Sequence, residues 1–433
     1  MILDIFGNKN DSINEGTPCI LVSVITDSMD EHEAELSLAE LRRLADTAGA
    51  FTAAELIQRK HSPDKRTYLG SGKVEELKAL CTNLCASLVV VDCELSPSQI
   101  RNLEDALGDV RVIDRSMLIL DIFAYHAVTA EGKLQVELAQ LKYTAPRLIG
   151  RGSEMSRLGG GIGTRGPGES QLETDRRHIQ RRINALEAEI DELAVKRMTI
   201  RASREKTGIP QIAIVGYTNA GKSTLLNKLT DAGILAEDKL FATLDPTTRK
   251  FCIPDGREIL LTDTVGFIRN LPHHLIKAFS STLEEAVYAD ILLIIVDASD
   301  PEATSQLNIT EKLLEELGAG DKPRIVAYNK CDREATEGLM APNLKEDSDT
   351  RKTVFISAVT GQGTDSLNEA ITKLLDSGKR NVTFLIPNSD AGVLNRLYAS
   401  AAVGNVEYGP DYITVSAVCD KKTEGQLSKY IKN

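Results

Sequence analysis

The segment 211–224 constrains the fold more than any other part of this 433-residue chain. It reads QIAIVGYTNAGKST, an apolar β-branched run followed by G-x-x-x-x-G-K-S, and an amphipathic stretch continues it. A strand followed by a glycine-containing loop and then by a helix is the context that a phosphate-binding P-loop requires. Gly216 and Gly221 let backbone N–H groups face phosphate oxygens. Lys222 can reach the β- and γ-phosphates, and the Ser223 hydroxyl can bind Mg²⁺.

The run RIVAYNKCD, downstream of the P-loop, indicates which base is bound. A buried strand there delivers Asn329, Lys330 and Asp332 in an N-K-x-D arrangement. The Asp332 carboxylate can accept hydrogen bonds from N1–H and the 2-amino group of guanine. Adenine offers only an acceptor at N1, so it would leave buried polar groups unpaired. The segment ISAVTGQG supplies Ser357 and Ala358 behind the guanine, and the predicted nucleotide is GTP.

Between these motifs, the strand of REILLTDTVGF ends in D-x-x-G. Asp263 is placed to hold Mg²⁺ through water, and the Gly266 N–H can contact the γ-phosphate. The segment that follows is therefore a candidate switch that responds to hydrolysis. Upstream, LFATLDPTTR offers Thr243 as the second hydroxyl ligand of Mg²⁺, with Thr247 and Thr248 as less favoured candidates.

Phe267 occupies the position directly after D-x-x-G, where Ras-like GTPases place a glutamine that orients the attacking water. A phenyl ring cannot make the required hydrogen bonds, so we expect slow intrinsic hydrolysis that an outside surface completes. The alternative is that Phe267 is apolar packing and another group of the chain holds the water. We assign the catalytic roles to Lys222, Thr243 and Gly266.

The periodicity of the chain predicts an α/β fold with parallel sheets. β-Branched runs alternate with amphipathic helical stretches before the P-loop and again after it, and a strand, a helix and a strand end the chain. We expect four domains: an N-terminal α/β domain at 1–125, a helical hairpin with a glycine-rich tip at 126–208, a P-loop domain at 209–378 and a small α+β domain at 379–433.

The hairpin is predicted from two amphipathic stretches around RLGGGIGTRGPGES. Leu134, Leu138 and Leu141 lie on one helical face, and a near-heptad apolar pattern runs from Leu172 to Leu193. The economical arrangement is an antiparallel pair of helices with residues 150–168 as the tip.

Charge is segregated along the chain. The formal net charge is −12, which alone argues against a nucleic-acid partner, yet residues 142–204 hold 13 Lys and Arg against 8 Asp and Glu. The longest apolar run, ILLIIV, is too short to cross a bilayer, and the seven cysteines form no CxxC pair. We expect a cytoplasmic protein with reduced thiols and no stable membrane insertion.

Five segments together resemble the HflX family of ribosome-associated GTPases: RLGGGIGTRGPGESQLETDRR, GYTNAGKSTLLNKLT, FATLDPTTR, DTVGFIRNLPHHL and NKCD. The resemblance covers nearly the whole chain except its last fifty residues, and the glycine-rich signature is its most specific part. It implies binding to the large ribosomal subunit and GTPase activity stimulated by ribosomes. It further implies splitting of stalled or idle 70S ribosomes, often under stress. Separately, we expect a monomer off the ribosome.

The resemblance also carries site residues to this sequence. Its Mg²⁺ ligands fall on Ser223 and Thr243, and its GTP and GDP contacts fall on Gly216, Tyr217, Thr218, Asn219, Ala220, Gly221, Lys222, Ser223, Phe241, Ala242, Thr243, Leu244, Asp245, Asp263, Thr264, Val265, Gly266, Asn329, Lys330, Cys331, Asp332, Ser357, Ala358 and Val359.

The glycine-rich tip then resembles a probe that enters ribosomal RNA. Arg151, Arg157 and Arg165 can pair with phosphates or stack on bases, and the glycines allow close backbone approach. Two alternatives stay open. The tip can be a flexible interhelical loop, and the protein can be a GTP-timed factor that binds RNA or a ribosome-assembly intermediate without splitting anything.

Overall fold

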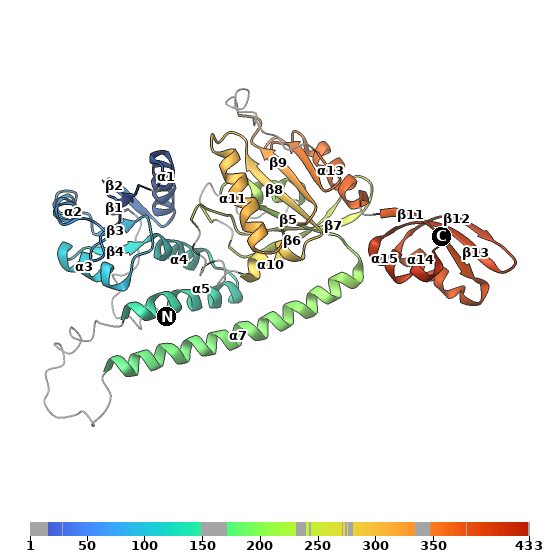
Figure 1. Ribbon diagram of the computed structural model, residues 1–433, viewed down its shortest axis with the longest axis horizontal. Coiled ribbons are helices and arrows are strands. Elements are labelled where there is room, and N and C mark those ends of the chain that lie inside the picture. Colours follow the sequence, from blue (N-terminus) through green and yellow to red (C-terminus); the bar gives the residue numbers. More distant parts are fainter. Residues whose placement is uncertain are drawn as a thin grey trace.

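The structure is a computed structural model, and Figure 1 shows its arrangement. The described residues are 16–27, 29–148, 171–230, 240–241, 244–270, 272, 275, 280–333, 347–377 and 379–431.

The N-terminal region is a parallel four-stranded sheet with the strand order β2-β1-β3-β4. Its strands are β1 Thr17–Ile25, β2 Ala50–Arg59, β3 Leu88–Val91 and β4 Arg111–Asp114. Its helices are α1 Glu31–Thr47, α2 Ser71–Asn83, α3 Pro97–Leu107 and α4 Arg115–His126. Alternate residues of β1 face two different cores, because successive side chains of a strand point to opposite faces. Helices α1 and α4 cover one face of the sheet, and α2 and α3 cover the other.

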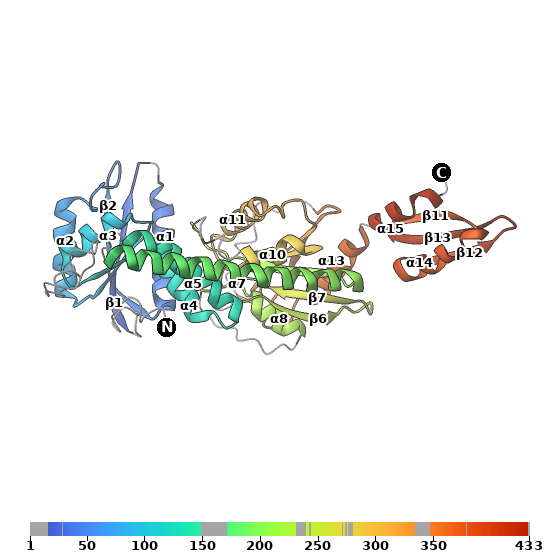
Figure 2. The same ribbon diagram turned by 90° about the horizontal axis from the view of Figure 1, so that it is seen from below.

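Two antiparallel helices form the hairpin. They are α5 Ala130–Thr144, followed by the 3₁₀ turn η1 Ala145–Leu148, and the long α7 Gln171–Thr207. Leu141 is buried against Ile179, Ile183 and Leu186, with Leu134 and Leu138 alongside. Figure 2 shows α7 running from the N-terminal sheet to the second sheet. The seam follows the predicted apolar pattern, whereas the expected tip at 150–168 lies outside the described residues.

The P-loop region is built on a six-stranded sheet with the order β10-β9-β8-β5-β7-β6, in which only β6 is antiparallel to its neighbour. Its strands are β5 Gln211–Gly216, β6 Thr247–Cys252, β7 Glu258–Asp263, β8 Ile291–Asp297, β9 Arg324–Asn329 and β10 Arg351–Phe355. Its helices are α8 Lys222–Thr230, α10 Ser280–Tyr288, α11 Ala303–Glu316 and α13 Thr364–Ser377. Parallel strands end at one sheet edge, so the loops that carry the motifs meet there.

The C-terminal region is an antiparallel sheet with the order β11-β13-β12. It comprises β11 Lys379–Pro387, η2 Asn388–Asp390, α14 Gly392–Ser400, β12 Ala402–Tyr408, β13 Tyr412–Asp420, α15 Lys421–Gln426 and η3 Ser428–Tyr430. In both views it lies at the end of the molecule opposite the N-terminal sheet (Figures 1 and 2). The predicted α/β fold with parallel sheets, a helical region and a small C-terminal α+β part is confirmed; strands β2, β4 and β12 were not predicted.

One apolar core belongs to the N-terminal region and to the P-loop region together. Phe123 of α4 contacts Phe241, with ring centroids 4.6 Å apart. Leu244, Val265 and Ile268 are buried in the same cluster. The two segments that flank the phosphate site are therefore packed against the N-terminal region rather than exposed to solvent.

We predict that Leu186→Ala destabilises the hairpin. Leu186 is fully buried in the seam, and its truncation leaves a cavity, so the free energy of unfolding should fall by about 2–4 kcal/mol. Urea titration followed by far-ultraviolet circular dichroism measures the change. The matched control is Val195→Ala on the same helix, which is 65% exposed and should change stability by less than about 0.5 kcal/mol. Equal losses in both variants would contradict the seam.

Candidate nucleotide site

Close contacts leave no room for a side chain at either P-loop glycine. Gly216 has a φ of 144°, and a Cβ there would clash with the carbonyl oxygen of Ile295 on β8. Gly221 has a φ of 97°, and a Cβ there would clash with the Asn329 amide. Both values lie in the left-handed region that favours glycine. The motif therefore brings the P-loop against the end of β9, which carries the predicted base-binding residues.

Lys222 lies at the floor of the phosphate site. Its ammonium donates to the carbonyl oxygens of Gly216 at 3.2 Å and Tyr217 at 2.7 Å, and the residue is buried. Burial lowers the pKa of Lys222 to about 8, and the negative charge of Asp263 opposes that change. The Ser223 hydroxyl donates to Asp263 Oδ2 at 2.6 Å. An ammonium, a hydroxyl and a carboxylate thus meet at the amino end of α8.

The N-K-x-D residues support the P-loop from the other side. The Asn329 side chain donates to the Ala220 carbonyl at 2.8 Å and accepts from the Ala358 N–H at 2.9 Å. The Lys330 ammonium donates to the Asn219 carbonyl at 2.9 Å and pairs with Asp297. These contacts fix the P-loop and the loop after β10 relative to each other.

Asp332 is exposed at the rim of the same group of loops. A hydrogen bond with the Ser357 side chain lowers the pKa of Asp332, so its carboxylate is ionised at neutral pH and can accept hydrogen bonds from guanine. Val359 follows in the neighbouring loop and is 69% exposed. The Cys331 N–H donates to the Ile356 carbonyl, so its backbone belongs to the support of the site.

The D-x-x-G segment lies directly against the P-loop. A Cβ on Gly266 would be 2.6 Å from Thr218 Cγ2 and 2.9 Å from Lys222 Nζ. The Phe267 N–H donates to the Gly216 carbonyl at 3.1 Å, and its carbonyl accepts from the Thr218 N–H at 2.8 Å. The Phe267 ring is 1% exposed and belongs to the core on the α10–α11 side of the sheet. Its role in this structure is packing, and it offers no group that could orient a water.

The segment around residue 244 faces the N-terminal region and the hairpin. Phe241 and Leu244 are buried with Phe123, and Asp245 contacts Thr129, the N-cap residue of α5. The Asp245 carboxylate accepts from the Val128 N–H at 2.9 Å, the Thr129 N–H at 2.8 Å and the Thr129 hydroxyl at 2.5 Å. The side chains of these three residues thus contact the N-terminal region and the start of α5, and their contact with the nucleotide stays a prediction.

The remaining predicted residues divide into two groups. Thr264 and Val265 are buried, and the Thr264 hydroxyl donates to the Ile214 carbonyl at 2.8 Å. Outside the described residues lie Ala242, Thr243, Arg151, Arg157 and Arg165. Among the described residues, no cluster of three His, Cys, Asp or Glu side chains could hold a metal ion. Of the predicted Mg²⁺ ligands, Ser223 and Asp263 are described and lie together, and Thr243 lies outside the described residues.

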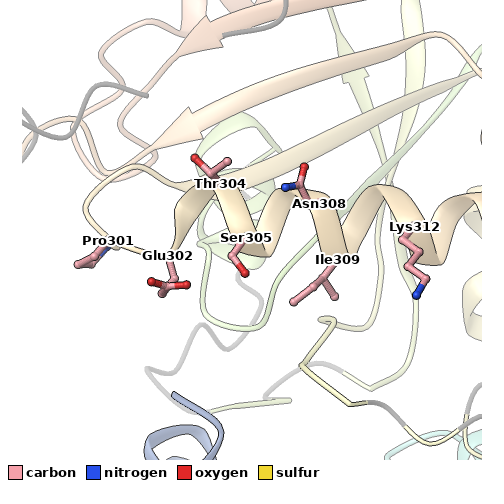
Figure 3. A pocket seen from close by; sticks show the side chains of 7 residues that line it. All are labelled: Pro301, Glu302, Thr304, Ser305, Asn308, Ile309 and Lys312. Carbon is pink, nitrogen blue, oxygen red and sulfur yellow. The ribbon is translucent and has the colours of Figure 1, made fainter. Parts of the chain in front are cut away.

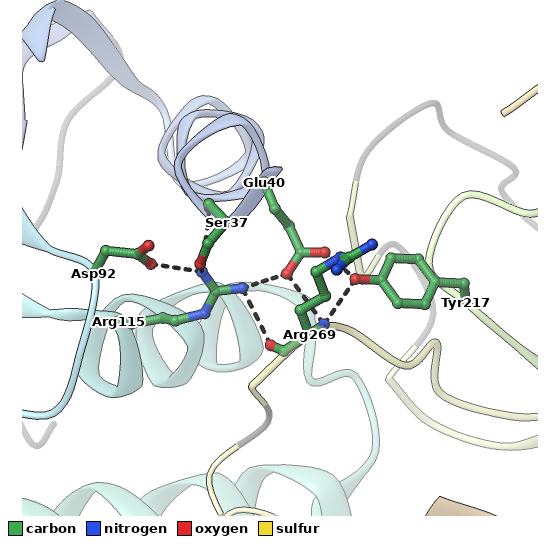
Figure 4. Close-up of polar contacts among 6 residues, drawn as sticks. All are labelled: Ser37, Glu40, Asp92, Arg115, Tyr217 and Arg269. Atoms are coloured by element: carbon green, nitrogen blue, oxygen red, sulfur yellow. Dashed lines mark hydrogen bonds and ion pairs between the residues drawn. The ribbon is translucent and has the colours of Figure 1, made fainter. Parts of the chain in front are cut away.

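Sequence reasoning missed a buried polar network that joins the site to the N-terminal region (Figure 4). Glu40 of α1 and Arg115 of α4 contact each other, and both contact the backbone of Arg269. Tyr217, the residue after the first P-loop glycine, donates its hydroxyl to Glu40. A charged residue on an amphipathic helix carries no sequence signal of such burial, because its partners come from a distant segment.

An open groove of about 500 Å³ lies along α11 beside this network (Figure 3). It is lined by Pro301, Glu302, Thr304, Ser305, Asn308, Ile309 and Lys312. Glu302 and Ser305 both accept hydrogen bonds at 3.0 Å from the Arg269 guanidinium. The groove thus borders the segment that follows D-x-x-G.

The phosphate loop, the base-selecting loop and the D-x-x-G segment on a parallel sheet define a P-loop GTPase. Family models agree: "GTP-binding GTPase N-terminal" matches residues 35–124, "GTP-binding GTPase Middle Region" matches 126–204, and "50S ribosome-binding GTPase" matches 211–330. GTPase HflX of Lacrimispora saccharolytica is 52% identical over 398 residues, 92% of both chains. The chain therefore belongs to the HflX family of GTPases, and it is a GTP hydrolase with a GTPase domain of the ribosome-binding class.

Another relative and one solved structure are also similar to this chain. GTPase HflX of Escherichia coli strain K12 is 40% identical over 395 residues, 91% of both chains. Among solved structures, a GTP-binding protein of Sulfolobus solfataricus in complex with GDP is 27% identical, covers 82% of this chain and 98% of its own, and has a TM-score of 0.42. Within the described residues, every helix is too short or too polar to span a bilayer.

We predict that Asp332→Asn transfers the base preference from guanine to xanthine. An amide in place of the carboxylate cannot accept both guanine donors, whereas xanthine carries an oxygen where guanine has its amino group. GTP affinity should fall at least about tenfold, and XTP affinity should rise. Fluorescent-nucleotide titration measures both. Asp365→Asn, in the first turn of α13, is the control and should change neither affinity. Unchanged GTP affinity in Asp332→Asn would refute the assigned base contact.

Proposed function

We propose that this GTPase binds the large ribosomal subunit and uses its GTP cycle to split stalled or idle 70S ribosomes, in rescue or recycling under stress. The observation that carries the proposal is the link between the hairpin and the segment after the D-x-x-G switch. The Arg201 guanidinium of α7 pairs with Glu284 at 2.9 Å and Glu285 at 2.8 Å, both on α10. It also lies 4.2 Å from the ring centroid of Tyr288.

This link couples the hairpin to the segment that follows D-x-x-G. Helix α7 has 37 residues and is about 55 Å long at 1.5 Å per residue. It is held to α5 by the Leu141 seam and by the pair of Arg182 with Glu137. The described part of the hairpin is therefore joined to α10 by packed side chains and ion pairs.

The charge of the hairpin suits a nucleic-acid partner. Residues 142–204 carry five more positive than negative charges, although the chain as a whole is acidic. We propose that Arg151, Arg157 and Arg165 at the tip contact ribosomal RNA through phosphates and bases. A ribosomal partner implies a cytoplasmic location.

For catalysis we propose that Lys222 and the Gly266 N–H stabilise the transferring phosphoryl group, while Ser223 and Thr243 hold Mg²⁺ and Asp263 binds it through water. The bond between Ser223 and Asp263 brings hard oxygen donors together beside Lys222, as Mg²⁺ requires. Because Phe267 is buried, the attacking water must be ordered by another group. We propose that the ribosome provides that order and accelerates hydrolysis.

A second reading has the protein binding RNA or an assembly intermediate in its GTP state without separating subunits. Sedimentation of 70S ribosomes in sucrose gradients, with the protein and a nonhydrolysable GTP analogue, distinguishes the two. Splitting predicts a shift to free subunits that GDP does not cause. Co-sedimentation with intact 70S particles and no free subunits would favour the second reading.

We predict that Arg157→Gln together with Arg165→Gln weakens ribosome binding and lowers the slope of log affinity against log salt by about two, one for each phosphate that the tip no longer neutralises. GTP affinity should not change. Co-sedimentation at several salt concentrations measures the slope. The control pair, Arg42→Gln with Arg66→Gln in the N-terminal region, removes the same charge and should keep the slope. If the tip variant fails to bind GTP, the tip serves folding rather than RNA contact.

A further inference from the structure

Thr218 of the P-loop carries a buried hydroxyl group that has no hydrogen-bond partner within the described part of the chain. The residue is 6% exposed. A hydroxyl group that is buried without a partner costs free energy, so such groups are uncommon in folded proteins. The neighbouring Thr264 follows this rule, because its buried hydroxyl donates to the Ile214 carbonyl at 2.8 Å. The Thr218 hydroxyl is therefore available to a bound ligand.

The peptide bond between Tyr217 and Thr218 places this residue at the phosphate site. Its carbonyl oxygen accepts from the Lys222 ammonium at 2.7 Å, and its N–H donates to the Phe267 carbonyl at 2.8 Å. Lys222 can reach the γ-phosphate from one side, and the Gly266 N–H can contact it from the other. Thr218 thus lies beside both groups that are expected to hold the reacting phosphate.

Packing fixes the rest of the Thr218 side chain. Its Cα and its methyl carbon Cγ2 lie against Gly266, so closely that a Cβ on Gly266 would clash with both. Few values of χ1 are open to a β-branched residue, so the position of the methyl group also sets the direction of the hydroxyl. The hydroxyl is therefore ordered before the nucleotide binds.

Hydrolysis of GTP needs an ordered water molecule beside the γ-phosphate. The water oxygen forms a bond to the γ-phosphorus, the bond from that phosphorus to the β–γ bridging oxygen breaks, and one water proton passes to the released phosphate. The Phe267 ring offers no hydrogen bond to this water. A threonine hydroxyl can accept one, and the reaction leaves the hydroxyl unchanged.

We propose that Thr218 is a further catalytic residue, whose hydroxyl accepts a hydrogen bond from the attacking water. One hydrogen bond restrains the position of the water but does not fix its direction, so hydrolysis by the chain alone stays slow and an outside surface still accelerates it. The inference rests on the proposed placement of the γ-phosphate between Lys222 and the Gly266 N–H. It does not depend on the ribosomal partner.

The test is the rate constant for a single turnover of bound GTP by the purified protein without ribosomes. Thr218→Val keeps the shape of the side chain and removes the hydroxyl. The rate constant should fall at least about tenfold, whereas the dissociation constants for GDP and for a nonhydrolysable GTP analogue should change by less than about twofold. Thr218→Ser, which has the hydroxyl without the methyl group, should recover the rate constant to within about threefold of that of the unchanged protein.

A structural role is separated by the melting temperature without nucleotide. Because the Thr218 hydroxyl has no described partner to lose, Thr218→Val should not lower it. Thr310→Val on α11 is the matched control, since the buried Thr310 hydroxyl donates to the Gln306 carbonyl at 2.9 Å. That variant should lower the melting temperature and leave the rate constant unchanged. Should Thr218→Val not fold, Thr218→Ala and Thr218→Ser form a pair that differs only in the hydroxyl.

A rate constant within about twofold of that of the unchanged protein in folded Thr218→Val overturns the proposal. Weaker binding of the analogue at an unchanged rate also overturns it, because the hydroxyl would then contact the γ-phosphate rather than the water. Lys222→Ala tests the phosphate placement separately and should weaken binding of the analogue. If it does so while Thr218→Val keeps its rate, the role of Thr218 alone is wrong. If Lys222→Ala binds the analogue as tightly as the unchanged protein, the proposed phosphate placement fails as well.

Discussion

The guanidinium of Arg115 joins the N-terminal region to the segment that follows D-x-x-G. It is buried, it contacts Asp92 and Glu40 within the N-terminal region, and it reaches across to the carbonyl of Arg269. A buried guanidinium without its carboxylates would cost several kcal/mol, so these groups are stable only together. The consequence is that the N-terminal region and the nucleotide site cannot change independently.

Apolar packing and the hairpin also connect the N-terminal part of the chain to the P-loop region. Phe241 and Leu244 enter the core of the N-terminal region, and Asp245 binds the N-cap residue of α5. On the opposite side of the site, Arg201 of α7 holds α10 through two carboxylates. The described residues around Leu244 and the segment after D-x-x-G therefore contact the two parts that precede the P-loop in the chain. An outside surface that moves the hairpin or the N-terminal region would act directly on them.

The sequence predicted what depends on local geometry and missed what depends on distant partners. Gly216, Gly221, Lys222 and Asn329 could be assigned from the sequence because the P-loop and N-K-x-D motifs have a defined local geometry. The structure brings these residues together. Phe241 could not be placed, because an apolar residue in a loop reads the same whether it faces a nucleotide or a core. Glu40 reads as an ordinary polar residue of an amphipathic helix. Strand β2 was missed because its alternation is weak and its pairing with β1 decides its conformation.

We propose that GTP hydrolysis is slow until an outside surface orders the attacking water, because Phe267 is buried and offers no group that could do so. The most direct measurement is GTP turnover by the purified protein, alone and with large ribosomal subunits. We predict slow turnover alone and stimulation of about tenfold or more, which corresponds to at least about 1.4 kcal/mol of barrier. Fast turnover alone that is indifferent to ribosomes would mean that the chain itself positions the water, and would contradict the account.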